Sequence, residues 1–134
     1  MGAGSKLAHN VQDAAEIYFA YKLQSELETH NKHVSTYAST LKQEFDDYLS
    51  ERQITFSQFF KHHFYAKNVD KHVKLIAKII IDIYPNEYFD IRCVEGPSRN
   101  EGKKRDIVII HLNERIDDTT YDWTQYPHIS VSLK

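Results

Sequence analysis

The stretch IVIIHL, residues Ile107–Leu112, is apolar almost throughout. A strand with both faces covered has this composition, because neither row of its side chains meets water. The segments Tyr88–Val94 and His128–Leu133 alternate between apolar and polar residues, a pattern typical of strands with one buried face. We therefore predict a three-stranded antiparallel meander whose central strand is Ile107–Leu112.

The segment Glu95–Lys104 joins the first two predicted strands and contains Gly96, Pro97 and Gly102, residues that favour turns. We expect it to form the loop of a β-hairpin. Cations do not need strict geometry to contact phosphate groups. Four of them cluster in or next to this loop, at Arg99, Lys103, Lys104 and Arg105.

The chain before the sheet carries start signals and periodicity of helices. Asn10, with Asp13 three residues later, is a suitable N-cap for a helix from Val11 to about Glu28. The apolar residues of this helix lie on more than one side. We therefore expect it to pack against several neighbours or against a second subunit.

Two shorter helices are expected next. Ser35 or Thr36 can cap the second helix, in which apolar residues recur at steps of three and four as far as Tyr48. Thr55 and Gln58 form a capping box for the third helix, which is rich in phenylalanine.

The segment from Val69 to Tyr84 is the most regular helix of the sequence, and Pro85 ends it. Its apolar residues form one stripe that we expect to face the core, namely Val69, Val73, Ile76, Ile80 and Ile83. The opposite side carries lysines, namely Lys67, Lys71, Lys74 and Lys78.

These elements predict a single α+β domain over residues 6–134, with a helical N-terminal half of about four helices followed by a three-stranded antiparallel β-meander. Residues 1–5 have the composition of a cloning remnant and are left out of the fold. The 41% share of hydrophobic residues excludes a chain disordered throughout. Cys93 is a single cysteine and no apolar run spans a bilayer, so we expect a soluble, cytoplasmic protein without a membrane partner.

The order helix, strand, strand, strand over residues 69–134 resembles the start of the PD-(D/E)xK nuclease fold. The resemblance implies that Asp106 is a metal-binding acid and that Lys134 is the catalytic lysine of the family. Ser132 stands where the family has Glu or Asp. Such a site would cut phosphodiesters with Mg²⁺, which stabilises charge on the phosphate and activates a bound water.

A second interpretation uses the last three predicted helices and the first hairpin, an order found in winged-helix proteins. The net charge of −2 creates no overall attraction for nucleic acid, so binding would depend on local cations. The alternative is that the lysines are the solvated side of a core helix. The candidate nucleic-acid-binding residues are Arg99, Lys103, Lys104, Arg105, Lys71, Lys74 and Lys78.

Aromatic residues crowd the helical half, and those that stay exposed would favour a protein interface, whereas an aromatic-rich core is the alternative. We expect a small non-catalytic binding protein, such as a regulator, inhibitor or immunity-type factor. It would act on or beside nucleic-acid machinery through the aromatic helical surface and the basic loop, with a protein partner and without a cofactor. Contact with nucleic acid and self-association stay open. The alternative is an Mg²⁺-dependent nuclease domain, intact or degenerate, centred on Asp106 and Lys134.

Overall fold

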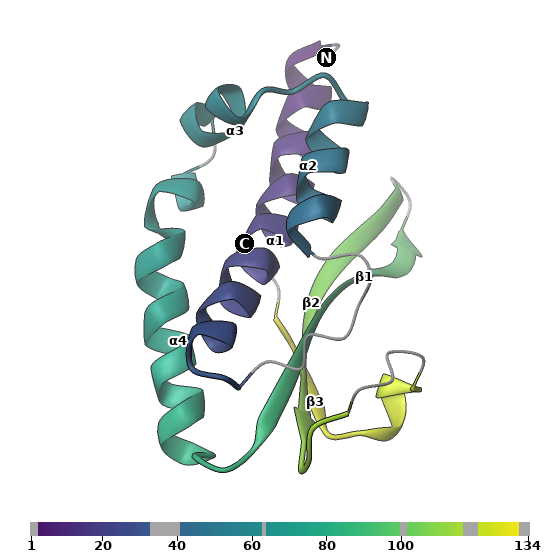
Figure 1. Ribbon diagram of the computed structural model, residues 1–134. Coiled ribbons are helices and arrows are strands. Elements are labelled where there is room, and N and C mark those ends of the chain that lie inside the picture. Colours follow the sequence, from purple (N-terminus) through teal and green to yellow (C-terminus); the bar gives the residue numbers. More distant parts are fainter. Residues whose placement is uncertain (1–2, 33–40, 63, 100–101, 117–120, 132–134) are drawn as a thin grey trace.

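The computed structural model describes residues 3–32, 41–62, 64–99, 102–116 and 121–131 of the 134-residue chain (Figure 1). Its described side chains are those of residues 13–32, 41–61, 66–94, 107–116 and 121–131. Four α-helices precede a three-stranded sheet, as predicted. The elements are α1 (Ala3–Thr29), α2 (Leu41–Glu51), α3 (Phe56–His62), η1 (Phe64–Asn68), α4 (Val69–Ile83), β1 (Tyr88–Arg99), β2 (Gly102–Leu112), η2 (Trp123–Gln125) and β3 (His128–Val131).

Helix α1 lies at the centre of the molecule. It contacts α2, α3 and α4 as well as β1 and β2 (Figure 1). This confirms the prediction that a helix with apolar residues on several sides packs against several neighbours. Its described part is buried on nearly every side, at Ala14, Ala15, Ile17, Tyr18, Phe19, Ala20, Leu23 and Leu27.

The predicted start of this helix is wrong. Helix α1 begins at Ala3, so Asn10 lies inside it and residues 3–5 belong to it. Residues 3–9 contain no proline, and adding turns to an existing helix is much easier than nucleating a new one. The other end follows the sequence more closely. Asn31 has a φ of 57°, and the Lys32 N–H donates to the Leu27 carbonyl at 2.8 Å, which closes the helix with a left-handed residue.

The capping box predicted before α3 is present. The Thr55 N–H donates to Oε1 of Gln58 at 2.9 Å, and the Gln58 N–H donates to Oγ1 of Thr55 at 3.1 Å. Ile54 and Phe59 on either side of this box are both buried. The predicted caps of the second helix, Ser35 and Thr36, lie outside the described residues.

The sheet has the predicted order β1-β2-β3 with antiparallel pairing, and β2 is the central strand. Ile109 lies opposite Ile91 on one side and opposite Ile129 on the other. One face of β2, with Ile107 and Ile109, joins the main core beneath α1. The other face is also covered, because Val108, Ile110 and Leu112 pack with residues of the connection to β3, namely Ile116, Tyr121, Trp123 and Tyr126.

The predicted hairpin loop Glu95–Lys104 is shorter than expected. Strand β1 continues to Arg99 and β2 starts at Gly102, with a shift of register between Glu95 and Ser98. Gly96 and Pro97 therefore lie within this irregularity rather than in an open loop. A proline has no N–H to offer a neighbouring strand, and it is tolerated where the pairing is interrupted.

The phenylalanines and tyrosines of the helical half form a core cluster more than a surface. The Tyr18 ring centroid lies 5.0 Å from that of Phe45 and 5.3 Å from that of Phe59, and all three side chains are buried. Phe56 is the one large aromatic side chain of this group that is markedly exposed among the described residues. The expected aromatic surface is thus wrong for most of the described rings. Among the described helices, none has both the length and the apolar composition needed to cross a bilayer.

Candidate docking surface

Helix α4 exposes a row of large aliphatic side chains. Leu75, Ile79 and Ile83 are 58%, 49% and 61% exposed. Residues four apart are neighbours on a helix surface, so the three side chains follow one another along α4. We call these three residues the aliphatic row.

The inner side of α4 explains why this row faces outward. Val73 and Ala77 are buried against the core that α1 shares with the sheet. Two residues along an α-helix correspond to a rotation of about 200°, so Leu75 points away from both of them. Helix α4 is therefore apolar on two sides, and only one of these sides has a partner within the described chain.

The assignment of Ile83 to the core stripe is wrong, and Leu75 and Ile79 are interface candidates that the sequence analysis missed. By Ile83 the predicted stripe has turned about 120° away from Ala77, so its side chain faces solvent. The signal that was available is the number of large aliphatic residues between Leu75 and Ile83, which exceeds what one face of a helix can hold.

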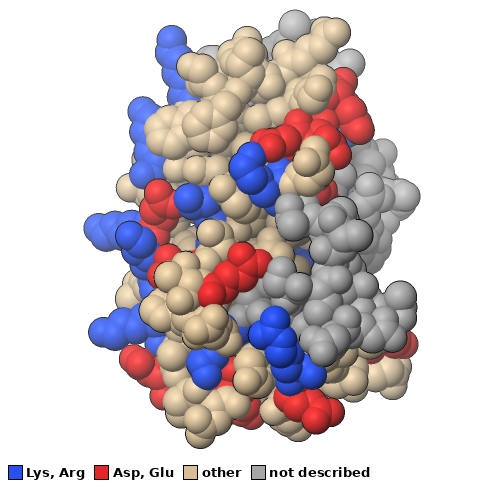
Figure 2. Space-filling model, in the orientation of Figure 1, with Lys and Arg blue, Asp and Glu red and all other residues tan. Residues whose placement is uncertain are grey.

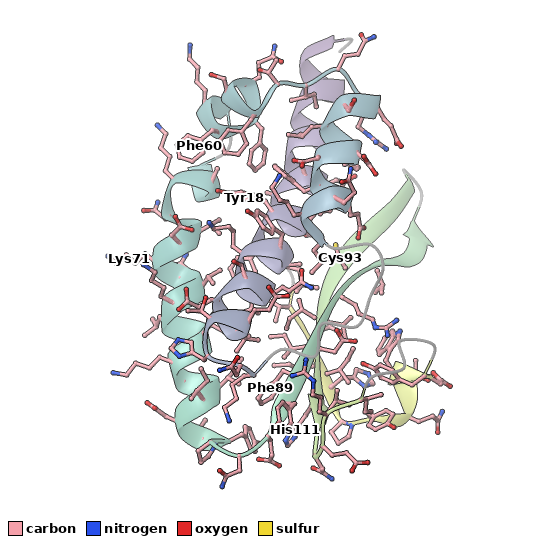
Figure 3. All side chains as sticks on the ribbon, viewed as in Figure 1. Tyr18, Phe60, Lys71, Phe89, Cys93 and His111 are labelled. Atoms are coloured by element: carbon pink, nitrogen blue, oxygen red, sulfur yellow. The ribbon has the colours of Figure 1, made fainter. Side chains whose placement is uncertain are left out.

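The predicted lysines Lys71, Lys74 and Lys78 are all exposed on α4. In Figure 2, lysine side chains stand out along the left margin of the molecule, over α4, and in Figure 3 Lys71 points away from the rest of the protein. None of the three forms an ion pair with another described residue. We call these three residues the lysine row.

The acidic residues of α4 offset only part of this charge. Nζ of Lys22 on α1 lies 3.0 Å from Oδ1 of Asp70, so this carboxylate is already paired. Asp82, the other acid of the helix, lies four residues after Lys78 on the same side and offsets one of the three lysine charges. The outer side of α4 therefore carries a positive charge directly beside an apolar row.

The other predicted basic residues lie on the β1–β2 hairpin and not on α4. Arg99, Lys103, Lys104 and Arg105 belong to the free end of the β1–β2 hairpin, and their side chains are outside the described set. Helices α1 and α2 lie between this end and α4 (Figure 1). The structure thus does not bring the hairpin cations and the lysine row together.

The winged-helix interpretation is not supported by the packing. In that arrangement α2, α3 and α4 would form a bundle of their own. Instead, α2 and α4 each pack against α1, which separates them (Figure 1).

The structure does not test whether the two residues of the nuclease interpretation lie close together, because neither side chain is described. Asp106 pairs with Val94 in the β1–β2 register, but its side chain is outside the described set. Ser132 and Lys134 also lie outside the described residues. Within the described part of the chain, no group of three or more His, Cys, Asp or Glu side chains could hold a metal ion. The nuclease site therefore stays a prediction.

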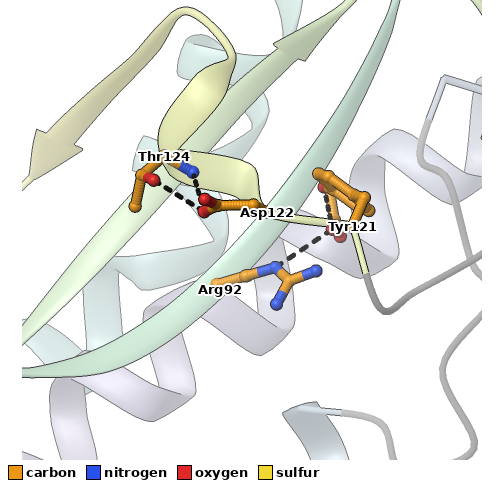
Figure 4. Close-up of polar contacts among 5 residues, drawn as sticks. Arg92, Tyr121, Asp122 and Thr124 are labelled. Atoms are coloured by element: carbon orange, nitrogen blue, oxygen red, sulfur yellow. Dashed lines mark hydrogen bonds and ion pairs between the residues drawn. The ribbon is translucent and has the colours of Figure 1, made fainter.

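A buried carboxylate ties the connection between β2 and β3 to the sheet (Figure 4). Asp90 on β1 is 1% exposed, and its Oδ2 accepts a hydrogen bond from the Tyr121 hydroxyl at 2.5 Å. Nε of Arg92 lies 3.3 Å from the same oxygen, and the guanidinium lies over the Tyr121 ring, 4.9 Å from its centroid. Burial and, second, the hydrogen bond to Asp90 raise the pKa of Tyr121.

The same connection is also ordered by Asp122. Its Oδ1 accepts hydrogen bonds from the N–H of Thr124 at 3.1 Å and from Oγ1 of Thr124 at 2.6 Å, which begins η2 (Figure 4). These bonds stabilise the charged carboxylate and lower the pKa of Asp122. Both acids of this region therefore have a clear role in holding the fold.

A group of rings lies next to the C-terminal end of α4. Tyr84 follows Ile83 directly, and its ring centroid lies 4.5 Å from that of His111 on β2. His111 stacks on Phe89, and its Nε2 lies 2.9 Å from Oε1 of Glu87. Tyr84 is itself partly exposed, and its ring packs against residues at this end of the sheet.

Comparisons with models of known families, with curated proteins and with solved structures find no match to this chain. The functional argument therefore depends on the residues and contacts described above.

Proposed function

We propose that the protein is a non-catalytic binding protein whose contact surface is the outer side of α4, formed by the aliphatic row and the lysine row. One observation carries this proposal. The three aliphatic side chains that follow one another along α4 are exposed, and they lie beside three lysines for which no ion pair is described. Single exposed apolar residues are common on protein surfaces. A contiguous apolar row rimmed by charge is typical of an interaction site.

The proposed partner is a protein. Lysines alone can bind phosphate groups, but a nucleic-acid backbone has no apolar surface to cover Leu75, Ile79 and Ile83. The outer side of α4 also carries no Arg, Asn or Gln that could recognise base edges. A role as a regulator, inhibitor or immunity-type factor, acting on or beside nucleic-acid machinery, stays a prediction about the identity of this partner.

A crosslinking experiment tests the proposal. A photoreactive amino acid is placed at position 79 in the aliphatic row and, as a control, at exposed position 50 on α2, and each protein is irradiated in an extract of its source cells. We expect one protein to crosslink at position 79 and not at position 50. After purification, this protein should bind the wild type at least tenfold more tightly than Leu75→Ser/Ile79→Ser. Equal crosslinking at positions 79 and 50 overturns the proposal. Equal affinity of the crosslinked protein for the wild type and for Leu75→Ser/Ile79→Ser also overturns it.

The nuclease alternative is tested separately. The purified protein and Asp106→Ala are incubated with plasmid DNA, single-stranded DNA and RNA in Mg²⁺ or Mn²⁺. We expect no cleavage by either protein. Cleavage that Asp106→Ala abolishes would establish a metal-dependent nuclease and contradict the non-catalytic proposal.

A further inference from the structure

The two rows on α4 restrict the shape and charge of whatever covers them. The aliphatic row runs over the nine residues from Leu75 to Ile83, and the eight rises between them make about 12 Å along the helix axis. The lysine row lies on one flank of it, because Lys74 and Lys78 are rotated by about 60° to 100° from Leu75 in the same sense. The other flank consists of the half-buried Ile76 and Ile80.

From this arrangement, and on the basis of the proposed function, we infer that the partner segment is an acidic amphipathic α-helix that lies along α4. Its apolar side chains would pack between those of the aliphatic row, as the side chains of two packed helices do at a separation of about 8 to 10 Å. Its acidic residues, spaced three and four apart on one flank, would face Lys71, Lys74 and Lys78. Such charges contribute more to orientation and association rate than to affinity.

A second copy of the chain fits this surface poorly. In a two-fold symmetric contact the same patch of each subunit faces its counterpart. Antiparallel pairing of two α4 helices would place both lysine rows at the same edge, and parallel pairing would place each lysine row against the apolar flank of the other helix. Asp82 is the only acid that each outer side contributes. The charge on α4 therefore favours a different, acidic partner.

A membrane surface also fits poorly. Helices that lie in a bilayer interface insert a broad apolar face with basic residues on their polar side. The broad apolar face of α4 is the inner one, where Val69, Val73 and Ala77 are buried. The outer row has lysines on one flank only, and its other flank is formed by the half-buried Ile76 and Ile80.

A selection experiment tests this inference without knowledge of the natural partner. A phage-displayed library of 20-residue peptides with high helix propensity is selected on the wild-type protein and counter-selected on Leu75→Ser/Ile79→Ser. We expect the recovered peptides to combine an apolar row with acidic residues on one flank. Their synthetic forms should shift the amide NMR signals of residues 71–84 on titration.

Charge reversal provides the sharper readout. Lys71→Glu/Lys74→Glu/Lys78→Glu should bind a recovered peptide at least tenfold more weakly, and a peptide whose acids are changed to lysine should regain affinity for this variant. Two matched controls should stay within twofold of the wild type. Ile129→Ser removes an aliphatic side chain on β3 that is exposed to the same 61% as Ile83, and Lys61→Glu reverses an exposed charge on α3.

Several outcomes overturn the inference. The first two are recovered peptides without an acidic excess and an unchanged peptide affinity after charge reversal. The third is binding of α4 to a DNA duplex or to phosphatidylglycerol vesicles that is tighter than its binding to the peptides. The fourth is concentration-dependent dimerisation that Leu75→Ser/Ile79→Ser abolishes. The proposed function fails independently, through the crosslinking experiment. If the crosslinked protein depends on the aliphatic row but the peptides show no acidic preference, only the acidic-helix inference is wrong.

Discussion

Val73 and Leu75 lie two residues apart on α4, yet Val73 is 2% exposed and Leu75 is 58% exposed. Both are branched aliphatic residues, so the difference comes from their positions around the helix and not from their chemistry. Val73 contributes to the fold, whereas Leu75 contributes little to it. An apolar side chain that the fold does not need is available for a partner.

This difference predicts that truncation lowers the stability much more at Val73 than at Leu75. Val73→Ala should lower the free energy of unfolding by about 2 kcal/mol, because it removes buried carbon atoms and leaves a cavity. Leu75→Ser should change it by less than about 0.5 kcal/mol. Urea denaturation followed by circular dichroism measures both values. A comparable loss in Leu75→Ser would mean that this side chain is part of the core.

The hydrogen bond between Tyr121 and Asp90 predicts a second stability effect. Tyr121→Phe removes the hydroxyl donor from a fully buried carboxylate and should destabilise the protein by about 1 to 3 kcal/mol. Tyr126→Phe is the matched control, because the Tyr126 ring packs in the same cluster and no hydrogen bond of its hydroxyl is described. If the two substitutions have equal effects, the bond to Asp90 does not stabilise the connection between β2 and β3.

The raised pKa of Tyr121 predicts a loss of stability at alkaline pH. Tyrosine in the unfolded chain loses its proton near pH 10, whereas burial and the hydrogen bond to Asp90 keep Tyr121 protonated in the folded protein. The folded state therefore binds more protons than the unfolded state above pH 10, and its stability falls as the pH rises. Tyr18, whose pKa is also raised by burial, acts in the same direction.

Urea titrations between pH 7 and pH 11 check this prediction. The decrease in the free energy of unfolding above pH 10 should be smaller in Tyr121→Phe than in the wild type. It should not vanish, because Tyr18 remains. Identical alkaline decreases in the two proteins would contradict the role of Tyr121.

The capping box at the start of α3 predicts a selective effect of small substitutions. Thr55→Ala removes the side-chain oxygen that accepts the Gln58 N–H, and it should cost about 1 kcal/mol. Thr55→Ser retains that oxygen and should cost much less. Chemical denaturation of the two variants compares these costs, and equal losses would show that the cap does not stabilise the protein.

Elements whose signals are local could be predicted from the sequence. The Thr55–Gln58 box depends on residues three apart, and the central position of β2 follows from the stretch Ile107–Leu112, which is apolar almost throughout. Both predictions are confirmed. The strand ends were less predictable, because Gly96 and Pro97 signal a turn equally well in an open loop and in an irregular stretch of paired strands.

The candidate docking surface could be identified only from the three-dimensional structure. The segment Leu75–Ile83 is rich in isoleucine on two sides, and periodicity alone does not tell which side faces a neighbour. The position of α1 decides this, because it contacts one side of α4 and leaves the other exposed. The sequence predicted that the lysines are exposed, but it did not predict that they lie beside the exposed aliphatic row.

The most direct test of the docking surface on α4 measures how tightly the partner that crosslinks at position 79 binds the wild type, Leu75→Ser/Ile79→Ser and Ile129→Ser. The account predicts that Leu75→Ser/Ile79→Ser weakens this affinity at least tenfold while Ile129→Ser changes it less than twofold. The same affinity for all three proteins, or an equal loss in both variants, would contradict it.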